Sequence, residues 1–250
     1  MTALHVEGVS ISFGGVEALS DVTIDIAEGV RRAVVGPNGA GKSTLFNVIG
    51  GQLKPDDGRV HLLGEDVTRR PAFQRAQRGL ARTWQITNLF DPLTVFETVQ
   101  LAVAANGRTR RVFWKALDSF ADVSSATNGL LTEWSLWEHR NRPVQDLAYG
   151  QQRLLEIAVS LAGNPQVLLL DEPTAGLTPG EAERMTTIVG DLPRSVTVVM
   201  IEHDMAVAFA LADEMTVLAQ GRVLAQGPSE EVRRREDVIA TYLGGHDAPG

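Results

Sequence analysis

The first third of the chain carries the hydrophobic spacing of β-strands. Val22, Ile24 and Ile26 alternate with polar residues, as in a strand with one buried face. Residues 33–35 form a short apolar run that ends at a glycine, which is typical of a strand buried on both faces. These patterns predict a half-buried strand followed by a central one.

Helical spacing follows. Leu45, Ile49 and Leu53 lie four residues apart and share one helix face, before residues 54–58 (KPDDG) break the chain. Strand-like runs are absent between residues 85 and 163, where apolar residues recur at helical intervals. We predict a helical insertion over 85–163.

Buried strands return in the last third, at residues 167–170, 196–201 and 214–218. Apolar strands that alternate with helices predict a parallel sheet covered by helices, and the early alternating strands predict an additional antiparallel layer. We therefore expect an α/β fold whose core combines residues 1–84 and 164–250.

Composition narrows the function classes. The chain has 250 residues, 44% of them hydrophobic and 22% charged, which suits a folded globular protein. The net charge of −8 argues against a nucleic-acid partner, and the lack of cysteine excludes disulfides and thiol chemistry. We find neither a secretory signal nor an apolar run near the ~18 residues of a spanning helix, so we expect a cytoplasmic protein that reaches a membrane only through partners.

The strongest motif is a phosphate-binding loop. Residues 36–44 read GPNGAGKST and fit G-x-x-x-x-G-K-[ST], between a predicted buried strand and a predicted helix. Glycines let successive N–H groups face one phosphate, and the helix N-terminus adds positive charge. Lys42 can reach the β- and γ-phosphates of a bound nucleotide, and the Ser43 hydroxyl can bind Mg²⁺. The nucleotide-binding residues predicted here are Asn38, Gly39, Ala40, Gly41, Lys42, Ser43 and Thr44.

Two further strands end in polar residues. The apolar run 167–170 delivers Asp171 and Glu172 to a strand end, where ligands of parallel sheets bind. Asp171 can hold Mg²⁺, and Glu172 can polarise a water for attack on the γ-phosphorus. His203 follows the strand 196–201 and can hydrogen-bond the γ-phosphate or the attacking water.

These residues, together with residues 147–153 (LAYGQQR), resemble the ATP-binding subunits of ABC transporters. The segment 147–153 occupies the place of the family signature, usually L-S-G-G-Q. The resemblance covers residues 4–244 and implies a P-loop NTPase (RecA-like) core. It also implies that Gln85 contacts the metal, that 175–178 is the D-loop, and that Phe13 stacks on adenine. Because Ile11 and Phe13 alternate, Phe13 can equally be an ordinary strand residue.

The resemblance implies a mechanism with partners. Two copies, identical or paralogous, sandwich two ATP molecules, and the signature of one covers the γ-phosphate held by the other. The signature residues are Ala148, Tyr149, Gly150 and Gln151. Their amides point at an anion if a helix begins near Gln151. Membrane permease subunits receive the motion, and residues 85–96 are the candidate docking segment, with internal packing as the alternative.

Three residues depart from the family pattern. Ala148 replaces the signature serine and removes a hydroxyl donor, which can weaken dimer closure by ~1.5–3 kcal/mol. Tyr149 replaces a glycine and cannot use positive φ freely. Thr178 stands where many members have aspartate.

A finer resemblance is to the subunits that power uptake of branched-chain and other hydrophobic amino acids. It is carried by LAYGQQR, by residues 81–85 (ARTWQ) and by residues 237–244 (DVIATYLG). It implies a peripheral position on the inner face of the cell membrane and, indirectly, a periplasmic solute-binding protein. The alternatives are an ATPase for lipid or lipopolysaccharide export and a soluble, non-transport ABC ATPase.

Overall fold

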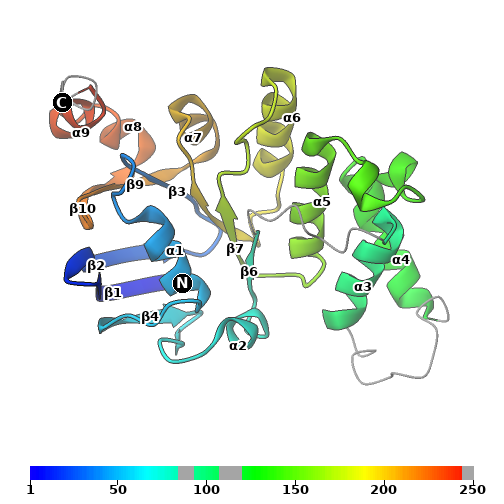
Figure 1. Cartoon of the computed structure of the whole chain (residues 1–250), viewed down its shortest axis with the longest axis horizontal. Helices are drawn as coiled ribbons and strands as arrows, with labels where there is room; N and C mark the ends of the chain where they lie inside the picture. The colour runs from blue at the N-terminus through cyan, green and yellow to red at the C-terminus, as the bar shows by residue number, and fades with distance from the viewer. Residues whose placement is uncertain (84–92, 107–119, 244–250) are drawn as a thin grey trace.

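Two β-sheets organise the fold, a six-stranded and a four-stranded one (Figure 1). The computed structural model describes residues 1–83, 93–106 and 120–243. The α/β class expected from the sequence, with a parallel sheet and an antiparallel layer, is confirmed by these two sheets.

The six-stranded sheet has the order β10-β9-β3-β8-β7-β6. Its neighbours pair in parallel, except that β10 runs antiparallel to β9. The strands are β3 (Arg31–Val35), β6 (Leu80–Arg82), β7 (Val167–Asp171), β8 (Thr197–Ile201), β9 (Glu214–Ala219) and β10 (Arg222–Pro228). All four apolar runs predicted as buried strands therefore lie in this sheet, whereas β6 and β10 are not among the predicted strands.

The four-stranded sheet is antiparallel, in the order β2-β1-β4-β5. Its strands are β1 (Thr2–Phe13), β2 (Val16–Ala27), β4 (Asp57–Leu62) and β5 (Glu65–Asp66). Val22, Ile24 and Ile26 are all buried, which confirms the alternation read from the sequence.

Side chains of the six-stranded sheet feed two hydrophobic cores, because successive residues of a strand point to opposite faces. Val34 and Leu169 pack with the antiparallel sheet and with α1 (Lys42–Gly50). Ala33 and Leu168 pack on the other face, against the later helices. The central strands are thus covered on both sides, as expected of parallel strands.

Three helices lie between β6 and β7 along the chain: α3 (Val95–Asn106), α4 (Ala121–Glu133) and α5 (Tyr149–Leu161). Helices α3 and α4 lie at the end of the molecule opposite to the C-terminal helix (Figure 1). The remaining helices are α2 (Ala72–Ala76), α6 (Pro179–Gly190), α7 (Met205–Leu211), α8 (Ser229–Val232) and α9 (Glu236–Leu243). Across the described residues, no helix combines the length and hydrophobicity that a membrane-spanning segment requires.

Two helix expectations need correction. Leu53 lies beyond α1, since the helix ends at Gly50 and Gly51 takes a left-handed conformation with φ 79°. The signature helix begins at Tyr149 rather than near Gln151, with Ala148 as its N-cap in an extended conformation. Tyr149 is therefore helical and needs no positive φ, so the strain expected from its replacing a glycine is absent.

Candidate functional site

The phosphate loop connects β3 to α1 and turns sharply at its glycines. Gly36 has φ 151°, and a Cβ there would lie 2.1 Å from the carbonyl oxygen of Leu218. Gly41 has φ 99°, and a Cβ there would lie 2.6 Å from the oxygen of Ala18. Backbone atoms cannot yield to such contacts, so both positions require glycine.

The N-terminus of α1 is open toward an anion. Gly41 is its N-cap, no described side chain caps it by a hydrogen bond, and its first turn holds no acidic residue. The loop residues Asn38 and Gly39 and the first-turn Ser43 are exposed, while Thr44 is half-buried and Ala40 buried. The first N–H groups of a helix have no intrahelical partner, so this end suits a phosphate.

Lys42 is buried beside this loop. Its Nζ donates to the carbonyl oxygens of Gly36 at 2.8 Å and Pro37 at 3.0 Å. Burial lowers the pKa of Lys42, while the charges of Glu172 and Asp171 act in the opposite direction. The lysine thus lies close enough to both carboxylates to sense their charge.

Asp171 is fixed by Arg82, a residue whose role was not predicted from the sequence. Arg82 Nη2 lies 3.1 Å from Asp171 Oδ2, and both side chains are largely buried. Arg82 Nη1 donates to Asn47 Oδ1 at 2.9 Å and Gln52 Oε1 at 3.0 Å. The arginine therefore couples the end of β7 to α1 and to the turn that follows it.

Glu172 and His203 form a pair across neighbouring strand ends. His203 Nε2 lies 2.7 Å from Glu172 Oε1, and the Glu172 amide donates to the carbonyl of Ile201 at 3.0 Å. Glu172 has φ +47°, which is unusual for a residue other than glycine. Such conformations cost about 1–3 kcal/mol and cluster at functional sites.

Glu202 is a second residue that the sequence did not mark. Its side chain is 3% exposed and accepts a hydrogen bond from Thr174 Oγ1 at 3.0 Å. Burial raises the pKa of Glu202 to about 7. This carboxyl joins the end of β8 to the segment that follows Glu172.

The signature residues lie in a separate place. Ala148, Gly150 and Gln151 line a pocket with α6 residues, among them Glu181. Figure 1 shows α5 on the far side of β7 from α1. Within the described chain, the structure thus unites Lys42, Asp171, Glu172 and His203 but does not bring the signature to them.

Phe13 and Gln85 are the remaining residues predicted for the site. Phe13, at the end of β1, is 49% exposed, so its ring is accessible to a ligand. Gln85 and most of the docking segment 85–96 lie outside the described residues.

The donor set fits a nucleoside triphosphate with its divalent metal ion. An uncapped helix end, a lysine and a glycine cradle face one side, and two carboxylates face the other. Carboxylate and hydroxyl oxygens are ligands that Mg²⁺ accepts alongside phosphates. Asp171 and Ser43 are the described residues that could hold it.

Comparisons with known proteins agree with this geometry. A family described as "ABC transporter" matches residues 19–175, and one described as "Branched-chain amino acid ATP-binding cassette transporter" matches residues 222–248. BraF of Pseudomonas aeruginosa is 37% identical over 96% of this chain and 97% of its own length. LivG of Escherichia coli K12 is 36% identical over the same shares. Both are named high-affinity branched-chain amino acid transport ATP-binding proteins.

Solved structures agree as well. An ATP-binding cassette of an ABC transporter, in its ADP conformation, superposes with a TM-score of 0.85 at 30% identity, covering 98% of this chain and 99% of that one. The nucleotide-free form of an ATP-binding cassette gives a TM-score of 0.84. The P-loop NTPase fold expected from the sequence is confirmed. The chain belongs to the ATP-binding subunits of ABC transporters, in the LivG-type branch, and is an ABC ATPase.

Proposed function

We propose that this protein hydrolyses ATP to power uptake of branched-chain or other hydrophobic amino acids through a membrane permease. The observation that carries the proposal is the convergence of Lys42, Asp171, Glu172 and His203 at one edge of the parallel sheet. The names of its relatives support the amino-acid substrate and favour uptake over lipid export.

The residues divide the reaction as follows. The loop amides and Lys42 bind the phosphates, and Lys42 exchanges its contacts with the Gly36 and Pro37 carbonyls for phosphate oxygens. Asp171 and Ser43 would hold Mg²⁺, which would supply positive charge to offset that of the phosphates. Gln85 is proposed as a further metal contact.

Glu172 is the proposed base. Its carboxylate accepts a proton from the attacking water, and His203 holds the carboxylate by the 2.7 Å contact. The fixed backbone of Glu172, tied to Ile201, limits where that water can sit. His203 is 46% exposed on its side chain, so it can turn toward the γ-phosphate.

A second ATP-binding subunit is needed to complete the site. The signature lies at the start of α5, where Ala148 and Tyr149 are exposed, Gln151 is half-buried and Gly150 is buried, and this helix lies on the far side of β7 from α1. The N-terminus of α5 attracts an anion, so we assign it to the γ-phosphate bound by a second copy or a paralogue. Phe13 is assigned to adenine stacking because the family resemblance gives it that role and its side chain is exposed at the end of β1.

Residues 1–84 and 164–250 are proposed as the nucleotide-binding core and 85–163 as a helical insertion that contacts the permease. An apolar groove opens beside it, lined by Phe73, Ala76, Ala81 and Val159 among others. Phe73 is 62% exposed, so its ring is accessible to a partner that docks in this groove. The protein is therefore placed on the inner membrane face by its permease, with a solute-binding protein on the other side.

The test uses the assembled transporter. The tagged chain is purified from solubilised membranes with its permease subunits, reconstituted in liposomes with the solute-binding protein, and assayed for uptake of labelled leucine. We expect ATP-dependent uptake that Glu172→Gln abolishes while it retains ATP and accumulates the dimer. If Glu172→Gln hydrolyses ATP at the parental rate, Glu172 is not the catalytic base.

The docking groove has its own test. Phe73→Asp should lose the permease in co-purification, and Ile239→Asp, at another exposed apolar position, is the matched control. Equal permease recovery with both variants would place the docking surface elsewhere.

A further inference from the structure

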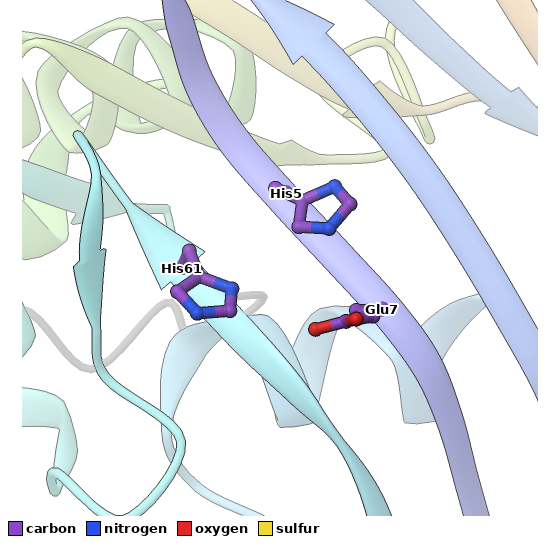
Figure 2. A group of neighbouring side chains, drawn as sticks. All are labelled: His5, Glu7 and His61. Atoms are coloured by element: carbon purple, nitrogen blue, oxygen red, sulfur yellow. The ribbon is translucent and has the colours of Figure 1, made fainter.

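Two histidines and a glutamate gather on the antiparallel sheet (Figure 2). His5 and Glu7 come from β1 and His61 from β4, and ligand atoms of the three lie within 4.8 Å of one another. The Glu7 carboxylate points toward the His61 ring (Figure 2). These residues line one surface depression together with Thr2, Asp25 and Gly64.

The strand register places these side chains on one face. His5 stands directly opposite His61 on one side and Asp25 on the other, and Glu7 follows two residues later. The neighbours Leu4 and Val6 point to the other face and are fully buried in the core. The cluster is therefore built on a rigid sheet rather than on a loop.

His5 is oriented by a carboxylate. Its Nδ1 lies 2.5 Å from Asp25 Oδ1. That contact fixes the ring and leaves Nε2 as the nitrogen available to a ligand. Metal-binding histidines have this arrangement, in which the second ring nitrogen donates to a carboxylate.

His61 carries an unsatisfied polar atom. Its Nδ1 is buried and has no hydrogen-bond partner among the described residues. Buried polar atoms without partners are uncommon and call for an explanation such as an ion.

We propose that His5, Glu7 and His61 form a binding site for Zn²⁺ or a similar divalent transition-metal ion. Two imidazoles and one carboxylate are a ligand set that zinc prefers, with water as the fourth ligand of a tetrahedron. Zinc–ligand bonds of about 2.0–2.1 Å place ligand atoms roughly 3.4 Å apart, so the side chains must close by up to about 1.4 Å. Glu7 is exposed and His61 is partly exposed, which leaves these two side chains free to move toward the oriented His5 ring.

A simple histidine stack explains less of this arrangement. The ring centroids are 5.6 Å apart and the planes are inclined by 32°. Stacking would account for neither the orientation of Glu7 nor the unpartnered Nδ1 of His61. A bound ion would cross-link β1 to β4 and stabilise the sheet, independently of nucleotide.

Calorimetric titration of the metal-stripped full chain with ZnCl₂ tests the site. Glu172 and His203 offer zinc another pair of ligands, so every protein in the test carries His203→Ala. We expect one zinc per chain, bound at least about tenfold more weakly after His5→Gln, His61→Gln or Glu7→Gln, and about tenfold more weakly after Asp25→Asn. His139→Gln, a histidine outside the cluster, should bind as the parent.

Thermal unfolding separates lost ligands from lost folding. Zinc should raise the Tm of the parent and of His139→Gln, because it binds only the folded state, and should leave the Tm of folded His61→Gln unchanged. Failure of the parent to bind zinc, or parental binding by both His5→Gln and His61→Gln, would overturn the proposal.

Discussion

Glu202 provides a sharp test of how burial controls stability in this protein. The carboxyl is 3% exposed, and its one side-chain partner in the described chain is Thr174. Burial raises its pKa to about 7, from an ordinary value of 4.5. We consider the substitution Glu202→Gln, which keeps the shape and the carbonyl acceptor but cannot ionise.

The sign follows from proton linkage. The folded protein binds this proton more tightly than the unfolded chain, because the folded pKa lies above 4.5. The contribution to stability is therefore fully present below pH 4.5 and is lost as the pH rises to about 7. Raising the pKa from 4.5 to about 7 corresponds to about 3 kcal/mol, at about 1.4 kcal/mol for each tenfold change in proton affinity. Above pH 7 the ionised Glu202 thus lowers the free energy of unfolding of the parent by about 3 kcal/mol relative to its value below pH 4.5.

Urea unfolding at a series of pH values measures the effect. Glu202→Gln should match the parent near pH 5 and exceed its free energy of unfolding by up to about 3 kcal/mol near pH 8. Glu183→Gln is the control, since Glu183 lines the same pocket but is exposed, and its profile should follow the parent. If the difference between Glu202→Gln and the parent stays constant from pH 5 to 8, the buried carboxyl does not titrate as argued.

Three other substitutions probe the nucleotide site. Lys42→Ala should weaken ATP binding more than about tenfold, since a charge-assisted contact is worth about 1.5–3 kcal/mol; a fluorescent ATP analogue measures this, and unchanged affinity would contradict it. Arg82→Gln should raise the Mg²⁺ concentration needed for half-maximal ATPase activity, because the Asp171 carboxylate loses the 3.1 Å contact that fixes it. An unaltered Mg²⁺ titration would show that Arg82 is not needed to position Asp171. Ala148→Ser should cap α5 and add about 1 kcal/mol of stability. In the Glu172→Gln background it should also strengthen the ATP-bound dimer, as measured by size-exclusion chromatography. A weaker dimer would refute the capping argument.

The central strands could be predicted because a short run of consecutive apolar residues indicates a strand that is buried on both faces. Residues 33–35 and 167–170 need no knowledge of their neighbours to be recognised as buried strands. The strand β6 could not be found, since it has three residues, Leu80–Arg82, and only Leu80 is buried. Its pairing with β7 sets its conformation, and such long-range pairing leaves no local pattern.

The same limit applies to the sites. Residues of the phosphate loop are contiguous, so their spacing alone announces them. Arg82 reaches Asp171 only because β6 and β7 pair in register, with Arg82 opposite Leu169. His5 and His61 are 56 positions apart in the sequence and meet only through the β1–β4 register. A sequence without a known register cannot bring such pairs together.

The departures in the signature and the D-loop are connected in the structure. Thr178 caps α6, and its amide and hydroxyl both donate to Glu181 Oε2, at 2.9 and 2.7 Å. A Cβ at Gly150 would lie 2.5 Å from Glu181 Oε1, so Gly150 packs closely against the side chain that Thr178 holds. Tyr149 in turn lies over Gly176, where a Cβ would be 3.1 Å from its ring. The starts of α5 and α6 therefore interlock.

Because the two helix starts interlock, Ala148, Tyr149 and Thr178 form one packed unit, and their departures from the family pattern are not independent of one another. An aspartate at position 178 could still cap α6, but its negative charge would face Glu181, which Thr178 avoids. Gln151 Oε1 accepts from the Ala148 amide at 3.1 Å, so the first turn of α5 keeps one cap although Ala148 has no hydroxyl. A change at Thr178 should thus move the signature as well as the D-loop, and the two helix starts should respond to a bound γ-phosphate together.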